Sequence, residues 1–245
     1  MKLIISLLFG LVGFAQASTT ATYADPAGDI DAGLSTGYGT LDILSMEVAN
    51  TATDINFKLT VNGDLSSTDW GKFMIGIATG KTDGALTGNG WGRPINLSYD
   101  NDPFAIQIVG MNHWIGSWVD GGGGSELLSY DNSGSSWSAP TSLASYSITS
   151  GATSEIFYSV PLTSLGLTAG DSFWFDAYSS GGGNADSAID SLANPNVSVS
   201  SWGGPYTSYA TAAGGPGLNS YTVVPEPSAC LLLILGTAGL LRRSR

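Results

Sequence analysis

The chain has 245 residues, of which 34 are Gly, 11% are charged, and 20 acidic residues against 8 basic ones give a formal net charge of −12. Nucleic-acid binding requires clustered Lys and Arg, so this composition excludes nucleic acid as a partner. One Cys and one His cannot form an internal disulfide or a thiolate and imidazole zinc site.

The N-terminus has the pattern of a secretory signal peptide over residues 1–17. Lys2 supplies a positive charge, an apolar run follows it, and Ala15 and Ala17 form a cleavage site of small residues. A buried N-terminal strand or helix is the alternative interpretation of the same apolar run. The regular order of the three parts favours a signal peptide that is cleaved after Ala17, and it predicts that the protein is exported.

Two segments rich in Asp and Asn are candidate sites for a calcium ion. The first holds Asp25, Asp29 and Asp31, and the second holds Asn184, Asp186 and Asp190. Loops rich in oxygen suit Ca²⁺, which takes about six to eight oxygen ligands. The alternative is that these side chains cap backbone amides in turns. We expect the three aspartates of the first segment to bind a structural Ca²⁺ ion, the one cofactor that the sequence suggests.

Residues 18–210 have the pattern of one all-β domain. Short runs rich in Ile, Val, Phe, Tyr, Trp and Thr alternate with period two and are separated by Gly, Asn, Asp and Ser. The pattern predicts an antiparallel β-sandwich of jelly-roll type. Strands are expected at residues 41–48, 54–61, 73–77, 104–109, 114–119, 126–130, 154–160, 172–178 and 197–201.

Helix signals are few. Pro161 begins a stretch that Gly166 ends, and a short helical turn is expected between them. A second turn is expected at 185–193, before a proline. Residues 211–222 are rich in Gly, Ala and Pro, so we expect them to be a linker between the domain and the C-terminal tail.

The chain has seven Trp and ten Tyr, which is many for its size. Aromatic faces stack on sugar rings while polar neighbours bind the hydroxyls, so we expect Trp91, Trp114 and Trp118 to bind polysaccharide. The alternative is that these rings fill a core poor in Leu.

The sequence gives less indication of catalysis than of binding. The sequence contains no nucleophile elbow, and His113 lies in no motif that supplies a nucleophile. We therefore expect a domain that is not an enzyme. Two carboxylates at a suitable separation would be enough for a glycosidase, so a secreted glycan-active hydrolase is the second hypothesis.

Residues 223–245 form a targeting tail of three parts. They are the motif Pro225, Glu226 and Pro227, an apolar segment at 229–241, and the terminal Arg242, Arg243 and Arg245. As a helix the apolar segment would span about 20 Å, which is short of the roughly 30 Å hydrocarbon core of a membrane. It is therefore predicted to be a short transmembrane helix that anchors weakly, with its arginines on the cytoplasmic side.

This tail resembles the PEP-CTERM sorting signal of exported bacterial proteins. The resemblance rests on the Pro-Glu-Pro motif, the Leu-rich segment and the terminal arginines. In that family an exosortase, a cysteine peptidase of the membrane, recognises and processes the tail. The resemblance implies contact with the inner membrane and an exosortase during sorting, a transient anchor, and then release to the cell envelope or the extracellular space. A single-pass anchor without processing is the alternative.

The beginning of the domain resembles the DOMON-like sandwich of family 9 carbohydrate-binding modules. The residues that carry this resemblance are the loop Asp25-Pro-Ala-Gly-Asp29 and the segments at 41–43 and 54–61. It implies a jelly roll that binds carbohydrate. The sequence as a whole predicts an exported, non-enzymatic protein of the cell envelope or extracellular matrix, whose sandwich binds glycan or has a structural role.

Overall fold

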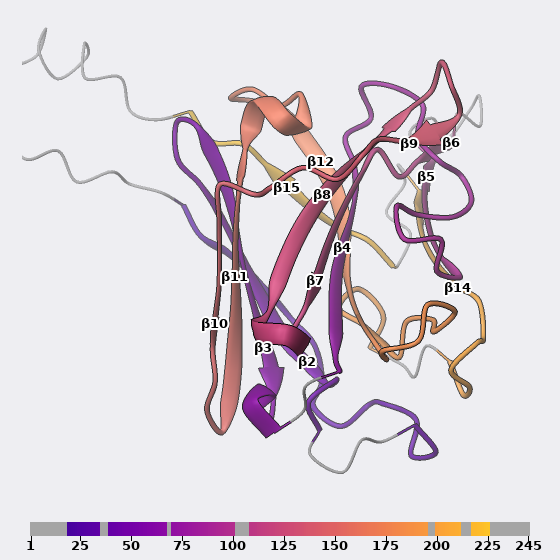
Figure 1. Ribbon diagram of the computed structural model, residues 1–245. Coiled ribbons are helices and arrows are strands. Elements are labelled where there is room, and N and C mark those ends of the chain that lie inside the picture. Colours follow the sequence, from indigo (N-terminus) through magenta and orange to yellow (C-terminus); the bar gives the residue numbers. More distant parts are fainter. Residues whose placement is uncertain are drawn as a thin grey trace, which may run out of the picture.

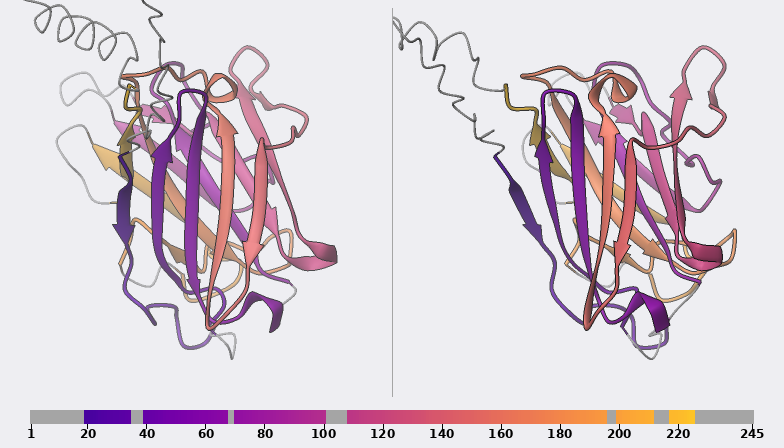
Figure 2. Two further views of the ribbon diagram at one scale, coloured as in Figure 1. Left: turned by 90° about the vertical axis from the view of Figure 1, so that its left-hand side faces the viewer. Right: turned by 60° about the vertical axis from the view of Figure 1, so that its left-hand side comes forward.

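The computed structural model describes residues 19–34, 39–67, 70–100, 108–195, 199–211 and 217–225, which form an all-β fold (Figure 1). Two sheets pack face to face as in a β-sandwich, and the first sheet stands in front of the second in Figure 2. A third, smaller sheet lies on the far side of the second. The expected all-β class and antiparallel sheets are therefore confirmed.

The strands of the first sheet are all antiparallel to their neighbours. In spatial order they are β1 (Ala21–Ala24), β2 (Ile43–Asn50), β3 (Asp54–Asn62), β11 (Thr153–Pro161) and β10 (Ser145–Thr149).

The second sheet is also antiparallel. Its order is β13 (Asp190–Ser191), β12 (Ser172–Ser180), β4 (Lys72–Ala78), β7 (His113–Trp118), β8 (Gly124–Asp131) and β9 (Ser136–Trp137), and β15 (Asn219–Thr222) pairs with β12.

The third sheet contains the parallel pair β14 (Tyr206–Thr211) and β5 (Ile95–Asp100), followed by the antiparallel β6 (Ile108–Gly110). Three short 3₁₀ helices are η1 (Leu65–Ser67), η2 (Asp120–Gly122) and η3 (Leu162–Leu165).

Alternation of apolar and polar residues explains how the two larger sheets share a core. In β3 every second residue from Ile55 to Val61 is buried, as the sequence predicts. The ring of Phe57 meets Phe173 and Phe175 of β12 edge to face, with centroids 6.1 and 5.9 Å apart. These aromatic contacts hold the first sheet against the second.

The other face of β12 is covered by the third sheet. Trp174 stacks on Tyr99 of β5 with ring centroids 3.8 Å apart. The hydroxyl of Tyr178 is 3.0 Å from the Ser208 hydroxyl of β14. Because both faces of this strand are covered, its sequence reads as a nearly continuous buried run and not as a half-exposed strand.

Several expectations need correction. Among the described residues, 199–201 form no strand. Residues 185–193 contain no helical turn, and the short strand β13 lies there instead. The expected linker 211–222 contains β15, and Tyr221 and Val223 are buried in the core, so the fold extends past residue 210. The turn expected between Pro161 and Gly166 is confirmed as η3.

The predicted targeting signals lie outside the described residues, apart from the first three residues of the tail, of which Val223 is buried in the core and Pro225 is exposed. The described ranges do not include residues 1–17 with Ala15 and Ala17, or the helix expected at 229–241. They also do not include Glu226, Pro227, Arg242, Arg243 and Arg245. In the part of the chain that is described, no helix is both long and apolar enough to cross a membrane.

Candidate functional site

A pocket of about 450 Å³ lies where β4 begins and β12 ends. We call it the tryptophan pocket. Its position is fixed by the pairing of Lys72, the first residue of β4, with Ser180, the last residue of β12. The described residues that line it are Lys72, Trp91, Arg93, Trp118, Asp120 and Asn184.

Two indole rings form the floor of this pocket because glycines lie beneath them. A Cβ atom at Gly116 of β7 would be 2.1 Å from Cζ2 of Trp91, and one at Gly124 of β8 would be 2.3 Å from Cζ2 of Trp118. Each ring therefore lies against a backbone that no larger residue could provide. The two ring centroids are 6.4 Å apart, and Nε1 of Trp91 donates a hydrogen bond of 2.5 Å to Glu126.

Charged side chains flank these rings. Nζ of Lys72 is 2.6 Å from the Asp120 carboxylate, and this hydrogen bond lowers the pKa of Asp120. Arg93 has only 4% of its surface exposed, and its guanidinium lies 5.5 Å from the centroid of the Trp91 ring. Its Nη1 donates to the hydroxyl of Ser180 and the carbonyl of residue 186, at 2.7 and 3.1 Å. Among the described residues, no carboxylate forms an ion pair with Arg93.

The structure brings together two of the three tryptophans that were expected to bind polysaccharide. Trp91 and Trp118 line the pocket, but Trp114 has no exposed surface. Its ring lies beneath Trp91 and against Tyr178, with centroids 6.2 Å away in both cases. The expectation for Trp114 is therefore wrong, because the segment that carries Trp91 covers it.

A neighbouring pocket of about 410 Å³ lies on the other side of the loop after β12. Trp70 and Trp202 meet there edge to face, with centroids 6.1 Å apart, and Gly181, Gly182 and Asp186 complete the lining. The same loop places Asn184 in the tryptophan pocket. Loop residues 181–186 thus separate two hollows that are each lined by tryptophan.

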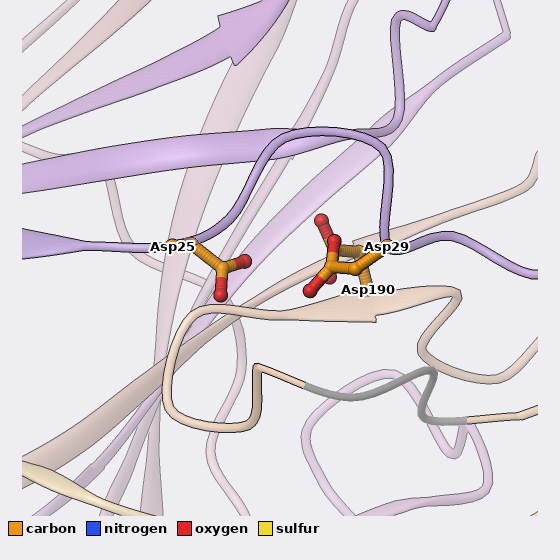
Figure 3. Close-up of side chains that lie close together, drawn as sticks. All are labelled: Asp25, Asp29 and Asp190. Carbon is orange, nitrogen blue, oxygen red and sulfur yellow. The ribbon is translucent and has the colours of Figure 1, made fainter.

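Three carboxylates form a second candidate site, which we call the acid cluster. Asp25 follows β1, Asp29 lies in the next turn, and Asp190 begins β13. Figure 3 shows the three side chains close together, and one oxygen of each lies within 4.8 Å of the others. Segments far apart in the sequence therefore place three acidic groups at one point.

Hydrogen bonds fix one member of the cluster and leave the other two without partners. Asp190 accepts from the backbone amides of Ile43 and Ser191, at 2.7 and 2.8 Å. Both oxygens of Asp25 and both of Asp29 are buried without a hydrogen-bond partner. The neighbouring Asp42 accepts from the Gly28 amide at 2.9 Å and so holds the turn between them.

Burial shifts the titration of this cluster. Desolvation, reinforced by the neighbouring carboxylates, raises the pKa of Asp25 to about 9 and that of Asp190 to about 7. The pKa of Asp29 is also raised, chiefly by burial. The cluster is thus a place where negative charge is costly unless a cation or protons neutralise it.

Asp31 does not belong to the acid cluster, contrary to expectation. Its Oδ1 accepts a 2.8 Å hydrogen bond from the amide of Gly33, so it caps a turn. Asp186 does the same for Gly183, at 2.8 Å. The turn-capping alternative therefore holds for these two residues, while Asp190 of the second segment joins Asp25 and Asp29 of the first.

Sequence reasoning missed the charged members of the tryptophan pocket. Lys72, Arg93 and Asp120 come from three separate segments and share no motif. The signal that could have been used is the pair Gly116 and Gly124, because a glycine inside a predicted strand often marks a close approach.

No family model, no curated protein and no solved structure matches the chain. The function is therefore inferred from the geometry of the two sites.

Proposed function

We propose that the protein is exported, sorted through its C-terminal tail to the cell envelope or the extracellular polymer, and binds saccharide there with a jelly-roll sandwich. The patterns at the two ends of the sequence support export and sorting. The tryptophan pocket supports the binding role.

The observation that carries this proposal is the pair of indole rings that line the pocket, with their centroids 6.4 Å apart and their planes tilted by 45°. Trp91 and Trp118 offer apolar faces to the C–H groups of a sugar ring. Lys72, Asp120 and Asn184 supply hydrogen-bonding groups around that floor. An apolar floor with a few polar groups is the usual construction of a small-molecule site.

The buried arginine suggests what kind of saccharide fits. Arg93 lines the pocket and forms no salt bridge with a carboxylate among the described residues, although the charge of the Asp186 carboxylate acts on it from the neighbouring loop. A guanidinium pairs best with a planar carboxylate, which it holds through two parallel hydrogen bonds. The pocket therefore favours a saccharide that carries an acidic group, such as a uronic acid, over a neutral one.

Isothermal titration of the full chain in mild detergent, against neutral and uronic-acid polysaccharides, tests the binding role. Trp118→Ala should lower the affinity at least about tenfold because it removes half of the aromatic floor. Trp137→Ala, on β9 at the other end of β8, is the matched control and should bind normally. Absence of binding to every polysaccharide would contradict the proposal and favour a structural role.

A glycan-active hydrolase has less support. The acid cluster has raised pKa values, but Asp25 and Asp190 are buried and present no open face to a sugar ring. The carboxylate found among the described lining residues of the tryptophan pocket, Asp120, is paired with Lys72. Hydrolysis of a polysaccharide that is lost on changing one carboxylate would reinstate the enzyme hypothesis.

Intact-mass measurement of the mature protein tests the sorting role separately. The protein should be recovered from a bacterial host that has an exosortase. We expect a chain that begins after Ala17 and lacks the apolar segment 229–241. A mature chain that keeps residues 228–245 would contradict processing and leave a membrane-anchored surface protein.

A further inference from the structure

We propose that Asp25, Asp29 and Asp190 bind a Ca²⁺ ion that ties the turn after β1 to β13. The first support is geometric. Two oxygens on one Ca²⁺ ion, each about 2.3–2.6 Å from it, lie no more than about 5 Å apart. One oxygen from each of the three carboxylates lies within 4.8 Å of the others, so one ion can contact all three.

The second support is a side chain buried without a partner. Asp25 has 8% of its surface exposed, and neither of its carboxylate oxygens has a hydrogen-bond partner. Figure 3 shows this carboxylate turned toward the space between it and Asp29 and Asp190. A buried carboxylate is normally paired, hydrogen-bonded or bound to a metal. A cation at this point would supply the missing partner for Asp25 and for both oxygens of Asp29.

The third support is that the basic side chains of the domain are engaged elsewhere. Between residues 18 and 220 the sequence has four Lys and Arg residues. Lys58 pairs with Glu47 and Glu155, Lys72 with Asp120, and Lys81 with Asp171, while Arg93 bonds to Ser180. The protein thus brings these carboxylates together without a basic side chain to balance them.

The ligand type points to a hard cation and to calcium in particular. All three groups are carboxylates, which suit Ca²⁺ and Mg²⁺, whereas zinc in structural sites prefers Cys and His. The backbone amides of Ile43 and Ser191 orient Asp190 and leave it further lone pairs for a metal. Calcium accepts irregular shells completed by backbone carbonyls and water, whereas magnesium demands a near-octahedral one.

Such an ion would act as a cross-link in a domain that has no disulfide. The one Cys of the chain is Cys230, in the tail, so the sandwich contains no cysteine. The acid cluster joins a turn near the N-terminus to β13 near the C-terminal end of the fold. Binding that occurs in the folded state alone stabilises that state.

Calorimetric titration and thermal melting of the full chain in mild detergent test the proposal. After EGTA treatment, Ca²⁺ should bind with one ion per chain, and 1 mM Ca²⁺ should raise the melting temperature by roughly 5–10 °C. An unchanged melting temperature together with no heat of binding would overturn the site, because protons alone would then neutralise the cluster. Preference for Mg²⁺ over Ca²⁺ would overturn the calcium assignment.

Substitutions of single aspartates test where the ion binds. Asp25→Asn and Asp29→Asn should each lower the calcium affinity at least about tenfold and abolish most of the calcium-dependent rise in melting temperature. Asp31→Asn, in the same turn but outside the cluster, is the matched control and should keep both. Equal calcium response in all three variants would place the ion elsewhere and overturn the proposal. Having two cluster variants keeps the test decisive if one of them fails to fold.

Discussion

Single glycines beneath the tryptophan pocket leave the space in which its indole rings lie. A methyl group at Gly116 would be 2.1 Å from the Trp91 ring, and such a contact must displace the indole. Gly203, by contrast, has no atom within 4 Å of its would-be Cβ and has no positive φ. An added methyl group should therefore displace an aromatic ring at Gly116 and displace nothing at Gly203.

We predict that Gly116→Ala lowers the affinity for a bound saccharide at least about tenfold, whereas Gly203→Ala leaves it unchanged. Tryptophan fluorescence and near-ultraviolet circular dichroism should change in the first variant alone. These spectra check the displacement of Trp91 independently of any ligand. Identical spectra for Gly116→Ala and the parent would show that the ring does not rest on this glycine.

A second prediction concerns Asp176, a fully buried carboxyl group of β12. It accepts hydrogen bonds from the Ser191 and Ser208 hydroxyls and from the amide of residue 193. Burial nevertheless raises its pKa from 3.8 to about 7. Between those two pH values the folded protein keeps this proton while the unfolded chain releases it, so this group makes stability fall as pH rises.

The variant Asp176→Asn removes that proton equilibrium while it keeps the shape of the side chain. Between pH 5 and pH 7 the parent should lose about 2 kcal/mol more of its free energy of unfolding than the variant does. Denaturant unfolding of both chains in the same buffers checks this, because titrating groups that do not interact with Asp176 contribute equally to both. The prediction fails if the two chains show the same pH dependence.

At the scale of elements, β15 closes the fold at its C-terminal end. It pairs with β12, and the hydroxyl of Tyr221 donates to Oδ1 of Asn50 at 2.8 Å. The same Oδ1 accepts from the amide of Val224 at 2.9 Å, and the Asn50 amide returns a bond to the Val224 carbonyl at 3.0 Å. This strand is therefore part of the domain and not a flexible connection.

A chain that ends after residue 218 should therefore be less stable than one that ends after residue 225. The loss is about 3 kcal/mol or more, since the burial of Tyr221 and Val223 and the bonds to Asn50 disappear. Both truncated chains lack the apolar tail, so their comparison isolates the contribution of β15. Equal denaturant midpoints would mean that the strand adds nothing to the fold.

Sequence patterns predicted the long strands well and the peripheral ones poorly. Those with regular alternation, such as β3 and β11, were found with nearly their true bounds. β2 alternates less regularly. A bulge between Ile43 and Ser45 moves its buried side chains from an odd-numbered position to even-numbered ones. β10 is largely exposed, and β14 pairs in parallel with a distant strand, so neither has a local hydrophobic signal.

The members of the acid cluster could not be predicted either, because tertiary contacts bring them together. The sequence singled out both Asp-rich segments but could not tell which members of each would meet. Asp190 joins Asp25 and Asp29 through the pairing of β13 with β12 and through its bond to Ile43, both of which are tertiary features. Asp31 lies nearer to Asp29 in sequence, yet its side chain turns to cap Gly33.

At the scale of the whole molecule, the two ends of the described domain lie on the same side of the fold (Figure 1). The hydroxyl oxygen of Tyr221 lies 3.2 Å from the carbonyl oxygen of Thr19. β15 pairs with the beginning of β12, whereas the pocket adjoins Ser180 at its other end. These two ends of β12 are roughly 26 Å apart. A chain anchored through its tail would therefore present the pocket away from the membrane.

The pocket and the acid cluster adjoin through consecutive residues of β12. Ser179 pairs with Asp190, while the Ser180 hydroxyl accepts from Arg93 and donates to the carbonyl of Ser187 at 2.6 Å. The loop between these strands also supplies Asn184 to the pocket. A cation that ties Asp190 to Asp25 and Asp29 would therefore restrict the loop that surrounds a bound saccharide.

We predict that Ca²⁺ and saccharide bind cooperatively. Replacing Ca²⁺ with EGTA should weaken saccharide binding by about fivefold or more, and saccharide should tighten Ca²⁺ binding by the same factor, because coupling between two sites is reciprocal. Titrations of each ligand with and without the other measure both factors. Asp25→Asn should remove the response of saccharide affinity to calcium, while Asp31→Asn keeps it. Equal saccharide affinity in calcium and in EGTA would show that the two sites are independent, since a rigid loop would then need no ion to hold it in place.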